Sequence, residues 1–219
     1  MKTGIIEELR KIATASISDS LDRVGIVRGI AAGVFPLLPN FKIVGPAVTL
    51  RQVPSHKAVS SPLHEEVVET IAKRGDVVVI EVAGGIVNGG ATWGASNSMY
   101  AKIKGIEGVV LDGATRDVER IRELRFPVFA RTRAPGTSRG RYETVSINQP
   151  VLLSGARVRA GDIVVGDDDG VVVIPIEEVE RALELAKVKE RFDGTVTNLL
   201  QENVPILEAF ERAKKENGW

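Results

Sequence analysis

The chain has 219 residues, 43% hydrophobic and 26% charged, which is enough to bury a substantial core. Its 29 basic and 29 acidic residues cancel, so no global charge favours nucleic acid or an anionic membrane as a partner. There is no cysteine, which excludes disulfides, thiol catalysis and thiolate metal sites.

The N-terminus turns acidic at Glu7 and Glu8, too early for a secretory signal peptide. No apolar run approaches 18 residues, so we expect no membrane span. Together with the lack of cysteine, these features favour a cytoplasmic protein.

The chain is predicted to begin with two helices, followed by a loop and a strand. Apolar residues recur at helical spacing over residues 4–13. Residues 16–25 resemble a second short helix with a serine cap and a glycine stop. Residues 26–41 hold two prolines and suggest a loop. The β-branched stretch 43–53 predicts a strand that Gly45-Pro46 bends near its start.

The middle of the chain alternates helical and strand patterns. In order they are a helix over 60–74, a strand over 77–80, a helix over 94–104, a strand over 109–111, a helix from 118 and a strand over 127–130. Such alternation predicts parallel strands joined by right-handed crossovers. In the helix over 94–104, we expect Ala95, Met99 and Ile103 to face inward.

After residue 131 the pattern becomes β-rich and then helical. Strands are predicted over 142–148, 161–166 and 171–174, and the last two are joined by the hairpin turn Asp167-Asp168-Asp169-Gly170. Helices follow over 176–189, 195–200 and 205–214. We therefore predict a single α/β domain over 1–219, with a β/β/α core built on a mixed or barrel-like sheet, flanking helices, and a helical C-terminal tail over 176–219.

The stretch from Gly84 to Gly94 contains five glycines between a strand and a helix. It lacks the Gly-Lys-Ser/Thr of a P-loop and the G-x-G-x-x-G spacing of a dinucleotide fold. One or two glycines would suffice for a tight connection, so five suggest close approach of the backbone to a ligand. A helix that begins near Gly94 would direct unpaired N–H groups at an anion.

Arg116 and Asp117 follow the next predicted strand. Arg116 offers a rigid fork of donors for a carboxylate or a phosphate, and Asp117 a hard oxygen ligand for a divalent cation. In the alternative reading, Thr115 caps a helix, Asp117 complements its dipole and Arg116 is a surface residue.

Other motifs have simpler interpretations. Residues 136–140 match G-x-S-x-G, but no strand precedes them and no helix follows, which argues against a serine hydrolase. The nearby arginines could bind phosphate or RNA, yet a solvated loop explains them: Arg131, Arg133, Arg139 and Arg141. Asp167–Gly170 lacks the spacing of a calcium loop. His56 and His64 lack zinc-helix spacing, and His64 stays a candidate for lining a pocket.

Several stretches carry a family likeness. They are Ala91-Thr92-Trp93-Gly94, Ala101-Lys102, Gly105-Ile106-Glu107-Gly108-Val109-Val110, Asp112-Gly113 and Arg116-Asp117, with support from residues 18–22, 127–130, 161–162 and 167–175. In this order they resemble the RraA-like family over roughly residues 10–215. That family includes the 4-hydroxy-4-methyl-2-oxoglutarate aldolases and was once labelled demethylmenaquinone methyltransferase.

The resemblance implies a swivelling β/β/α fold that assembles into homotrimers or homohexamers with sites near subunit interfaces. It implies that Arg116 binds a substrate carboxylate and that Asp117 holds a divalent cation, usually Mg²⁺, with Mn²⁺ as an alternative. Backbone amides would complete the anion site: Gly94, Ala95, Ser96 and Asn97.

The sequence departs from the aldolases at Ala95, where they usually carry an acid directly after the glycine of the Trp-Gly pair. That acid would help to orient a water or to transfer a proton. Its replacement stays open among Asp19, Asp22, His64 and a water.

The leading hypothesis is a metal-dependent carbon–carbon lyase that releases pyruvate from a 2-oxo acid, by aldol cleavage or by oxaloacetate decarboxylation. Decarboxylation needs no base to deprotonate a hydroxyl, so the alanine would harm it less. The alternative is a non-enzymatic regulator of the RraA type that binds a ribonuclease. A methyltransferase is rejected, because no glycine-rich Rossmann loop is present.

Overall fold

The computed structural model describes residues 3–27, 29–55, 64–86 and 89–219. Its helices are α1 (Thr3–Arg10), α2 (Thr14–Arg23), α3 (His64–Glu66), which passes into a π-helical turn (Val67–Ile71), α4 (Ala95–Lys104), α5 (Val118–Leu124), a 3₁₀ turn (Ile176–Glu178), α6 (Val179–Gln201) and α7 (Ile206–Asn217). Its strands are β1 (Ile30–Ala31), β2 (Phe35–Pro36), β3 (Ile43–Pro54), β4 (Val77–Val82), β5 (Gly108–Thr115), β6 (Val128–Arg133), β7 (Tyr142–Ile147), β8 (Val151–Leu153), β9 (Ala156–Val158), β10 (Ile163–Asp167) and β11 (Gly170–Ile174).

A large mixed sheet organises the molecule. Its strand order is β1-β11-β10-β3-β4-β5-β6-β2, and β7 also pairs with β3. Strands β4, β5 and β6 are parallel, as the alternating pattern predicted, and β3 adds a further parallel neighbour to β4. Strands β10 and β11 form the predicted antiparallel hairpin, whereas the small β8–β9 hairpin was not predicted.

Strand β3 belongs to both halves of this sheet. Its first residues, 43–46, pair with β10, and residues 47–52 pair with β4. Gly45 lies where β3 passes close to the turn at Gly75, because a Cβ at Gly45 would stand 2.1 Å from the carbonyl oxygen of Gly75. A side chain at this position would displace backbone rather than a flexible neighbour, so the bend requires glycine.

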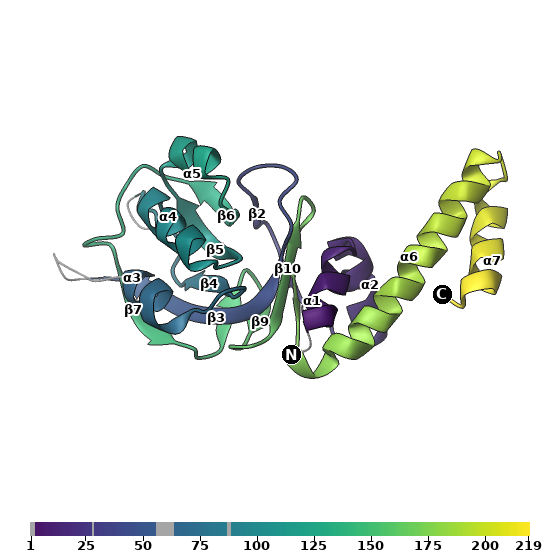
Figure 1. Ribbon diagram of the computed structural model, residues 1–219, viewed down its shortest axis with the longest axis horizontal. Helices are drawn as coiled ribbons and strands as arrows, with labels where there is room; N and C mark the ends of the chain where they lie inside the picture. Colours follow the sequence, from purple (N-terminus) through teal and green to yellow (C-terminus); the bar gives the residue numbers. More distant parts are fainter. Residues whose placement is uncertain (1–2, 28, 56–63, 87–88) are drawn as a thin grey trace.

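The strands separate three buried layers. On β4, Val77 and Val79 point into the core between the two halves of the sheet, while Val78 and Ile80 pack in the cluster that includes α4 and α5 residues. On β11, Val172 and Ile174 pack in the cluster that includes α1, α2 and α6. Because both faces are covered, the strands carry unbroken apolar runs, and the architecture is the predicted β/β/α arrangement (Figure 1).

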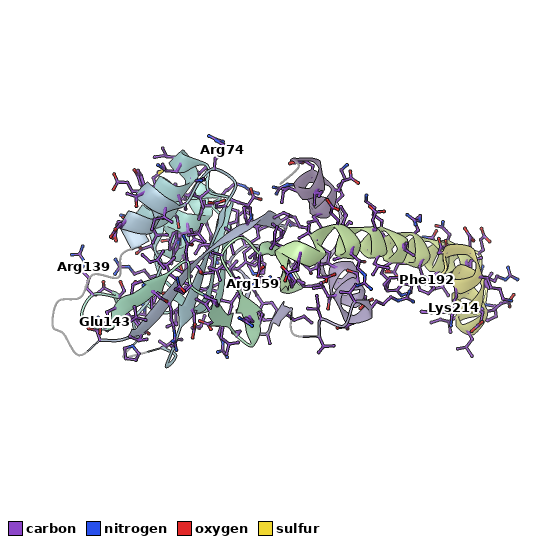
Figure 2. The ribbon with its side chains drawn as sticks, turned by 90° about the horizontal axis from the view of Figure 1, so that it is seen from below. Arg74, Arg139, Glu143, Arg159, Phe192 and Lys214 are labelled. Carbon is purple, nitrogen blue, oxygen red and sulfur yellow. The ribbon has the colours of Figure 1, made fainter. Side chains whose placement is uncertain are left out.

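The C-terminal helices differ from the prediction. Helix α6 runs unbroken from Val179 to Gln201, so the separate helix predicted over 195–200 was wrong. Gly194 does not end this helix, because Phe192 and Val196 on either side of it are buried against α7. The ring centroids of Phe192 and Phe210 lie 5.7 Å apart in an edge-to-face arrangement. Helix α7 folds back beside α6, away from the sheet (Figures 1 and 2).

Two further helical details were wrong. In α4, Met99 and Ile103 are exposed, and the small residues Ser98 and Ala101 are buried instead, which lets the helix approach its neighbours closely. Helix α2 has no serine cap; it begins at Thr14, whose N–H donates to Asp167 from β10 at 2.8 Å. The predicted helix over 60–74 is found only as α3 and its π-helical turn, and residues 60–63 lie outside the described part of the chain.

None of the helices in the described ranges is both long and apolar enough to cross a membrane.

Candidate functional site

The glycine-rich connection after β4 and the turn after β5 run side by side. The N–H of Thr92 donates to the carbonyl of Ala114 at 2.9 Å, and the N–H of Arg116 donates to the carbonyl of Trp93 at 3.0 Å. The carboxyl ends of adjacent parallel strands meet at one edge of a sheet, where ligands commonly bind in such folds. The glycine loop and the Arg-Asp pair are therefore neighbours, as the sequence suggested.

A buried tryptophan fixes the start of α4. The indole N–H of Trp93 donates to the Ser98 hydroxyl at 2.9 Å, and that hydroxyl donates to the carbonyl of Gly94 at 3.0 Å. Trp93 is almost fully buried, so this chain of hydrogen bonds lies inside the protein. It holds the first turn of the helix in one position beside the turn after β5.

Asp117 adopts a left-handed backbone conformation, with φ 58° and ψ 37°. Such a conformation costs on the order of 1 kcal/mol in a non-glycine residue and is found disproportionately at functional sites. Here the carboxylate reaches the first residue of α4: Oδ2 accepts the N–H of Ala95 at 3.1 Å. Arg116 Nε lies 3.6 Å from the same oxygen.

The alternative reading of this turn, a Thr115 helix cap, finds no support. Asp117 occupies the position before α5, with no side-chain hydrogen bond to that helix. The Thr115 hydroxyl instead donates to the carbonyl of Trp93 at 3.3 Å.

Gly94 is the glycine that admits this arrangement. A Cβ at Gly94 would lie 2.8 Å from Asp117 Oδ2 and 3.3 Å from Arg116 Cγ. Its φ of −158° is open to any residue, so contact with the Arg-Asp pair, not backbone strain, favours glycine here.

The other four glycines of the loop serve the fold. Gly84, Gly85 and Gly89 have φ between 65° and 83°, the left-handed region that favours glycine. Gly89 and Gly90 pair with Gly136 on the connection between β6 and β7. The interpretation that five glycines exceed what the turn needs was therefore wrong for Gly84, Gly85 and Gly89, whose backbone conformation favours glycine.

A cavity of about 500 Å³ opens at this edge of the sheet. Its lining comprises Glu65, Ala91, Thr92, Trp93, Gly94, Ser96, Asn97, Arg116, Asp117, Thr137, Ser138 and Arg139. Five of the six predicted site residues thus border one hollow. Ala95 does not line it, and its N–H is already held by Asp117.

Two parts of the lining were missed from the sequence. Thr137, Ser138 and Arg139 come from the loop that had been interpreted as merely solvated; pairing of Gly136 with Gly89 brings this loop to the cavity. Arg139 is exposed at the end of the molecule away from α6 (Figure 2). Glu65, from α3, is the second omission. Both depend on contacts between segments far apart in the chain, which no local pattern reveals.

The other candidate acids lie elsewhere within the described structure. Asp19 on α2 pairs with Lys189 of α6 at 3.3 Å, and neither Asp19 nor Asp22 borders the cavity. His56 and the side chain of His64 fall outside the described residues.

The donor set fits a hard divalent cation. In the part of the chain that the structure describes, no group of three or more histidines and acids converges on a metal position. Magnesium, however, usually keeps several waters and takes only one or two carboxylates plus substrate oxygens. Asp117 is 38% exposed and faces the cavity, so one oxygen ligand with room for waters and a substrate is available there.

Comparison with known families identifies one family model that matches most of this chain. The family model described as RraA-like, Aldolase/RraA, matches residues 14–173. The region outside this match includes α6 and α7.

Two curated relatives share the provisional name 4-hydroxy-4-methyl-2-oxoglutarate aldolase. The protein of Halalkalibacterium halodurans is 36% identical over 207 residues, which cover 94% of this chain and 92% of the relative. That of Deinococcus radiodurans is 31% identical over 170 residues, 76% of this chain and 96% of the relative.

Among solved structures, RraAS2 of Streptomyces coelicolor, described as an unusual member of the RNase ES inhibitor RraA protein family, aligns with a TM-score of 0.82. It is 30% identical, over 93% of this chain and 99% of that protein. A Pseudomonas syringae protein, at 24% identity and a TM-score of 0.84 over 95% and 98% of the two chains, shares the fold.

Proposed function

The chain belongs to the RraA-like family, and on that premise we propose that it is a divalent-metal-dependent carbon–carbon lyase acting on 2-oxo acids. The reaction is aldol cleavage of a 4-hydroxy-2-oxo acid, decarboxylation of oxaloacetate, or both, and pyruvate is released. We include in this proposal the self-association into a trimer or hexamer that the family resemblance implies.

One observation supports this proposal above the others. The Arg116 guanidinium and the Asp117 carboxylate stand at the first turn of α4, beside a cavity of about 500 Å³. A small anionic substrate needs fixed donors, and a lyase needs a group that stabilises negative charge on the keto oxygen. This corner offers candidates for both roles.

In the proposed complex, Arg116 binds the substrate carboxylate through its fork of donors. The N–H groups of Ser96 and Asn97, in the first turn of α4, face the same carboxylate with the positive end of the helix dipole. These contacts orient the 2-oxo group toward Asp117. Orientation of this kind lowers the entropic part of the barrier.

Asp117 would hold the divalent ion, magnesium or manganese. Bound there, the ion would supply Lewis-acid stabilisation of negative charge on the keto oxygen. The hydrogen bond from Ala95 and the nearby Arg116 keep the Asp117 carboxylate at the cavity wall.

A coupled pyruvate assay tests the proposal. We expect turnover of oxaloacetate or of 4-hydroxy-4-methyl-2-oxoglutarate with Mg²⁺, loss of that turnover after chelation, and its return when Mg²⁺ or Mn²⁺ is added. Asp117→Ala should abolish the metal-dependent part. Turnover that is absent from the wild type, or equal in wild type and Asp117→Ala, would contradict the proposal.

The similarity to RraAS2 supports a second candidate, a regulator that binds a ribonuclease. Retention of both Arg116 and Asp117 favours the enzyme, because contact with a protein partner does not require a site that binds a substrate carboxylate and a metal ion. Binding to an RNase E-type enzyme in calorimetry, together with no detectable Mg²⁺ binding, would favour the regulator.

A further inference from the structure

The proposed aldol cleavage needs a group that takes a proton from the 4-hydroxyl and later returns it. Position 95, where the related aldolases usually carry an acid, is alanine, and its side chain is buried in the cluster that contains Val67 and Val68. The group that supplies this proton transfer has to be sought elsewhere, first among the side chains that line the cavity.

The cavity lining restricts the choice. Its ionisable side chains in the described chain are Glu65, Arg116, Asp117 and Arg139. A guanidinium keeps its proton at any ordinary pH and cannot act as a base. Asp117 accepts the N–H of Ala95, lies beside Arg116 and is the candidate cation ligand. Glu65 is the remaining group, and it is a carboxylate.

Glu65 is held near the site by its own element. It precedes a π-helical turn in which Val67 and Val68 are buried in the same cluster as Trp93 and Ala95. A link from α4 also reaches this turn, since Lys104 Nζ donates to the carbonyl of Glu69 at 3.0 Å. The side chain of Glu65 is exposed and borders the cavity, so it can meet a substrate without distorting the core.

We propose that Glu65 is the proton-transfer residue of this lyase and takes over the role of the acid that is absent at position 95. This inference rests on the proposed function. The Glu65 carboxylate removes the proton of the substrate 4-hydroxyl as the C3–C4 bond breaks. The electron pair of that bond becomes the C2–C3 double bond of the pyruvate enolate, and C4–O becomes a carbonyl. The carboxylic acid of Glu65 then returns its proton to C3, which completes the methyl group of pyruvate.

Oxaloacetate decarboxylation uses only the second half of this cycle. It has no 4-hydroxyl to deprotonate, and water can supply the proton to C3. The two reactions should therefore depend on Glu65 to different extents, which a purely structural role would not produce.

The neighbouring residue provides a matched control. Glu66 is exposed on the same short helix and does not line the cavity. For Glu65→Gln we expect kcat for 4-hydroxy-2-oxo acid cleavage to fall about 10²-fold or more. Oxaloacetate decarboxylation should fall less than about tenfold on the same reasoning. Glu66→Gln should match wild type in both assays, and pyruvate methyl exchange in D₂O, followed by NMR, should slow only in Glu65→Gln.

A second variant tests whether a carboxylate at position 65 is what the reaction needs. Glu65→Asp keeps the acid and shortens the side chain by one methylene, so it should retain at least about tenfold more cleavage activity than Glu65→Gln. Mg²⁺ affinity, measured by calorimetry, should be the same in wild type and Glu65→Gln.

Failure of this inference is distinguishable from failure of the proposed function. An active wild type with Glu65→Gln equal to Glu66→Gln, an equal loss in cleavage and decarboxylation, or lost Mg²⁺ binding in Glu65→Gln would overturn the role of Glu65 alone. A wild type that turns over neither substrate would overturn both.

Discussion

Two aspartates, Asp117 and Asp167, lie at equivalent places, each beside the first residue of a helix. They differ in how many of their carboxylate acceptor positions the protein itself occupies. Asp117, after β5, accepts the N–H of the first residue of α4, and Asp167, at the end of β10, accepts the N–H of the first residue of α2. Each is a carboxylate brought from a distant strand to the positive end of a helix, where negative charge is favoured.

The surroundings of the two carboxylates differ. Asp167 also accepts the Thr14 hydroxyl at 2.5 Å, the N–H of Asp169 at 3.1 Å and the Lys42 ammonium at 3.0 Å, and it is 20% exposed. Among the residues that the structure describes, the Asp117 carboxylate accepts one hydrogen bond, from Ala95, has Arg116 farther away, and faces the cavity. A carboxylate has about four acceptor positions. Asp167 uses them on the protein, whereas Asp117 keeps capacity for a ligand.

The same substitution at both places should therefore separate function from stability. Asp117→Asn keeps an acceptor for the Ala95 N–H and a residue that tolerates the left-handed conformation, but loses the charge. We expect lyase turnover to fall about 10²–10³-fold, or about 3–4 kcal/mol in activation free energy. The free energy of unfolding should change by less than about 1 kcal/mol. Pyruvate release and urea denaturation measure the two quantities.

Asp167→Asn should have the opposite profile. It weakens charge-assisted hydrogen bonds to Thr14 and leaves Lys42 without its carboxylate. We expect a loss of about 1–3 kcal/mol in the free energy of unfolding, with turnover per folded molecule unchanged. A large activity loss in this variant, measured well below its unfolding transition, would show that the two places are not functionally distinct.

The stability difference between wild type and Asp167→Asn should depend on pH, and this dependence provides a control. Burial raises the pKa of Asp167, but hydrogen bonds from Thr14 and Lys42 outweigh it and hold the pKa below the ordinary value of 3.8. A depressed pKa stabilises the fold above 3.8 and loses that contribution as the pH falls through the folded value. The stability advantage of wild type over Asp167→Asn should therefore be full at pH 6 and shrink below about pH 4. An advantage that grows on acidification would contradict this assignment.

Gly94→Ala should have the smallest effect of the three, and only beside Asp117. The added methyl would stand 2.8 Å from Asp117 Oδ2, the free end of a side chain that can move. We expect the carboxylate to be displaced from the N–H of Ala95 and turnover to fall about tenfold, or about 1.4 kcal/mol. Stability should change by about 1 kcal/mol or less. Full activity in this variant would show that the observed position of Asp117 is not required.

The elements that the sequence predicted best are those whose pattern is local. The parallel strands β4 and β5 appear as unbroken valine-rich runs, and Arg116-Asp117 lies directly after the second of them. The glycine loop pointed to the edge of the sheet where the cavity lies, and there Gly94 contacts the Arg-Asp pair.

The missed features depend on contacts between distant segments. Glu65 and residues 137–139 reach the cavity through packing and through the pairing of Gly136 with Gly89. The inward face of α4 was misjudged because close packing selects Ser98 and Ala101 over the larger Met99 and Ile103. The length of α6 was missed because Gly194 is offset by buried neighbours that contact α7.

The double membership of β3 has a consequence for biosynthesis. As the chain leaves the ribosome from its N-terminus, residues 47–52 can pair with β4 soon after β4 emerges. Residues 43–46 find their partner only when β10, which begins at Ile163, has also been made. Until then that segment presents an open edge, which is a site for pairing with another nascent chain. Gly45-Pro46 lies within residues 43–46, and proline has no N–H to donate to a strand of another chain. The residues that bend β3 in the folded protein therefore also reduce wrong strand pairing before β10 has been made.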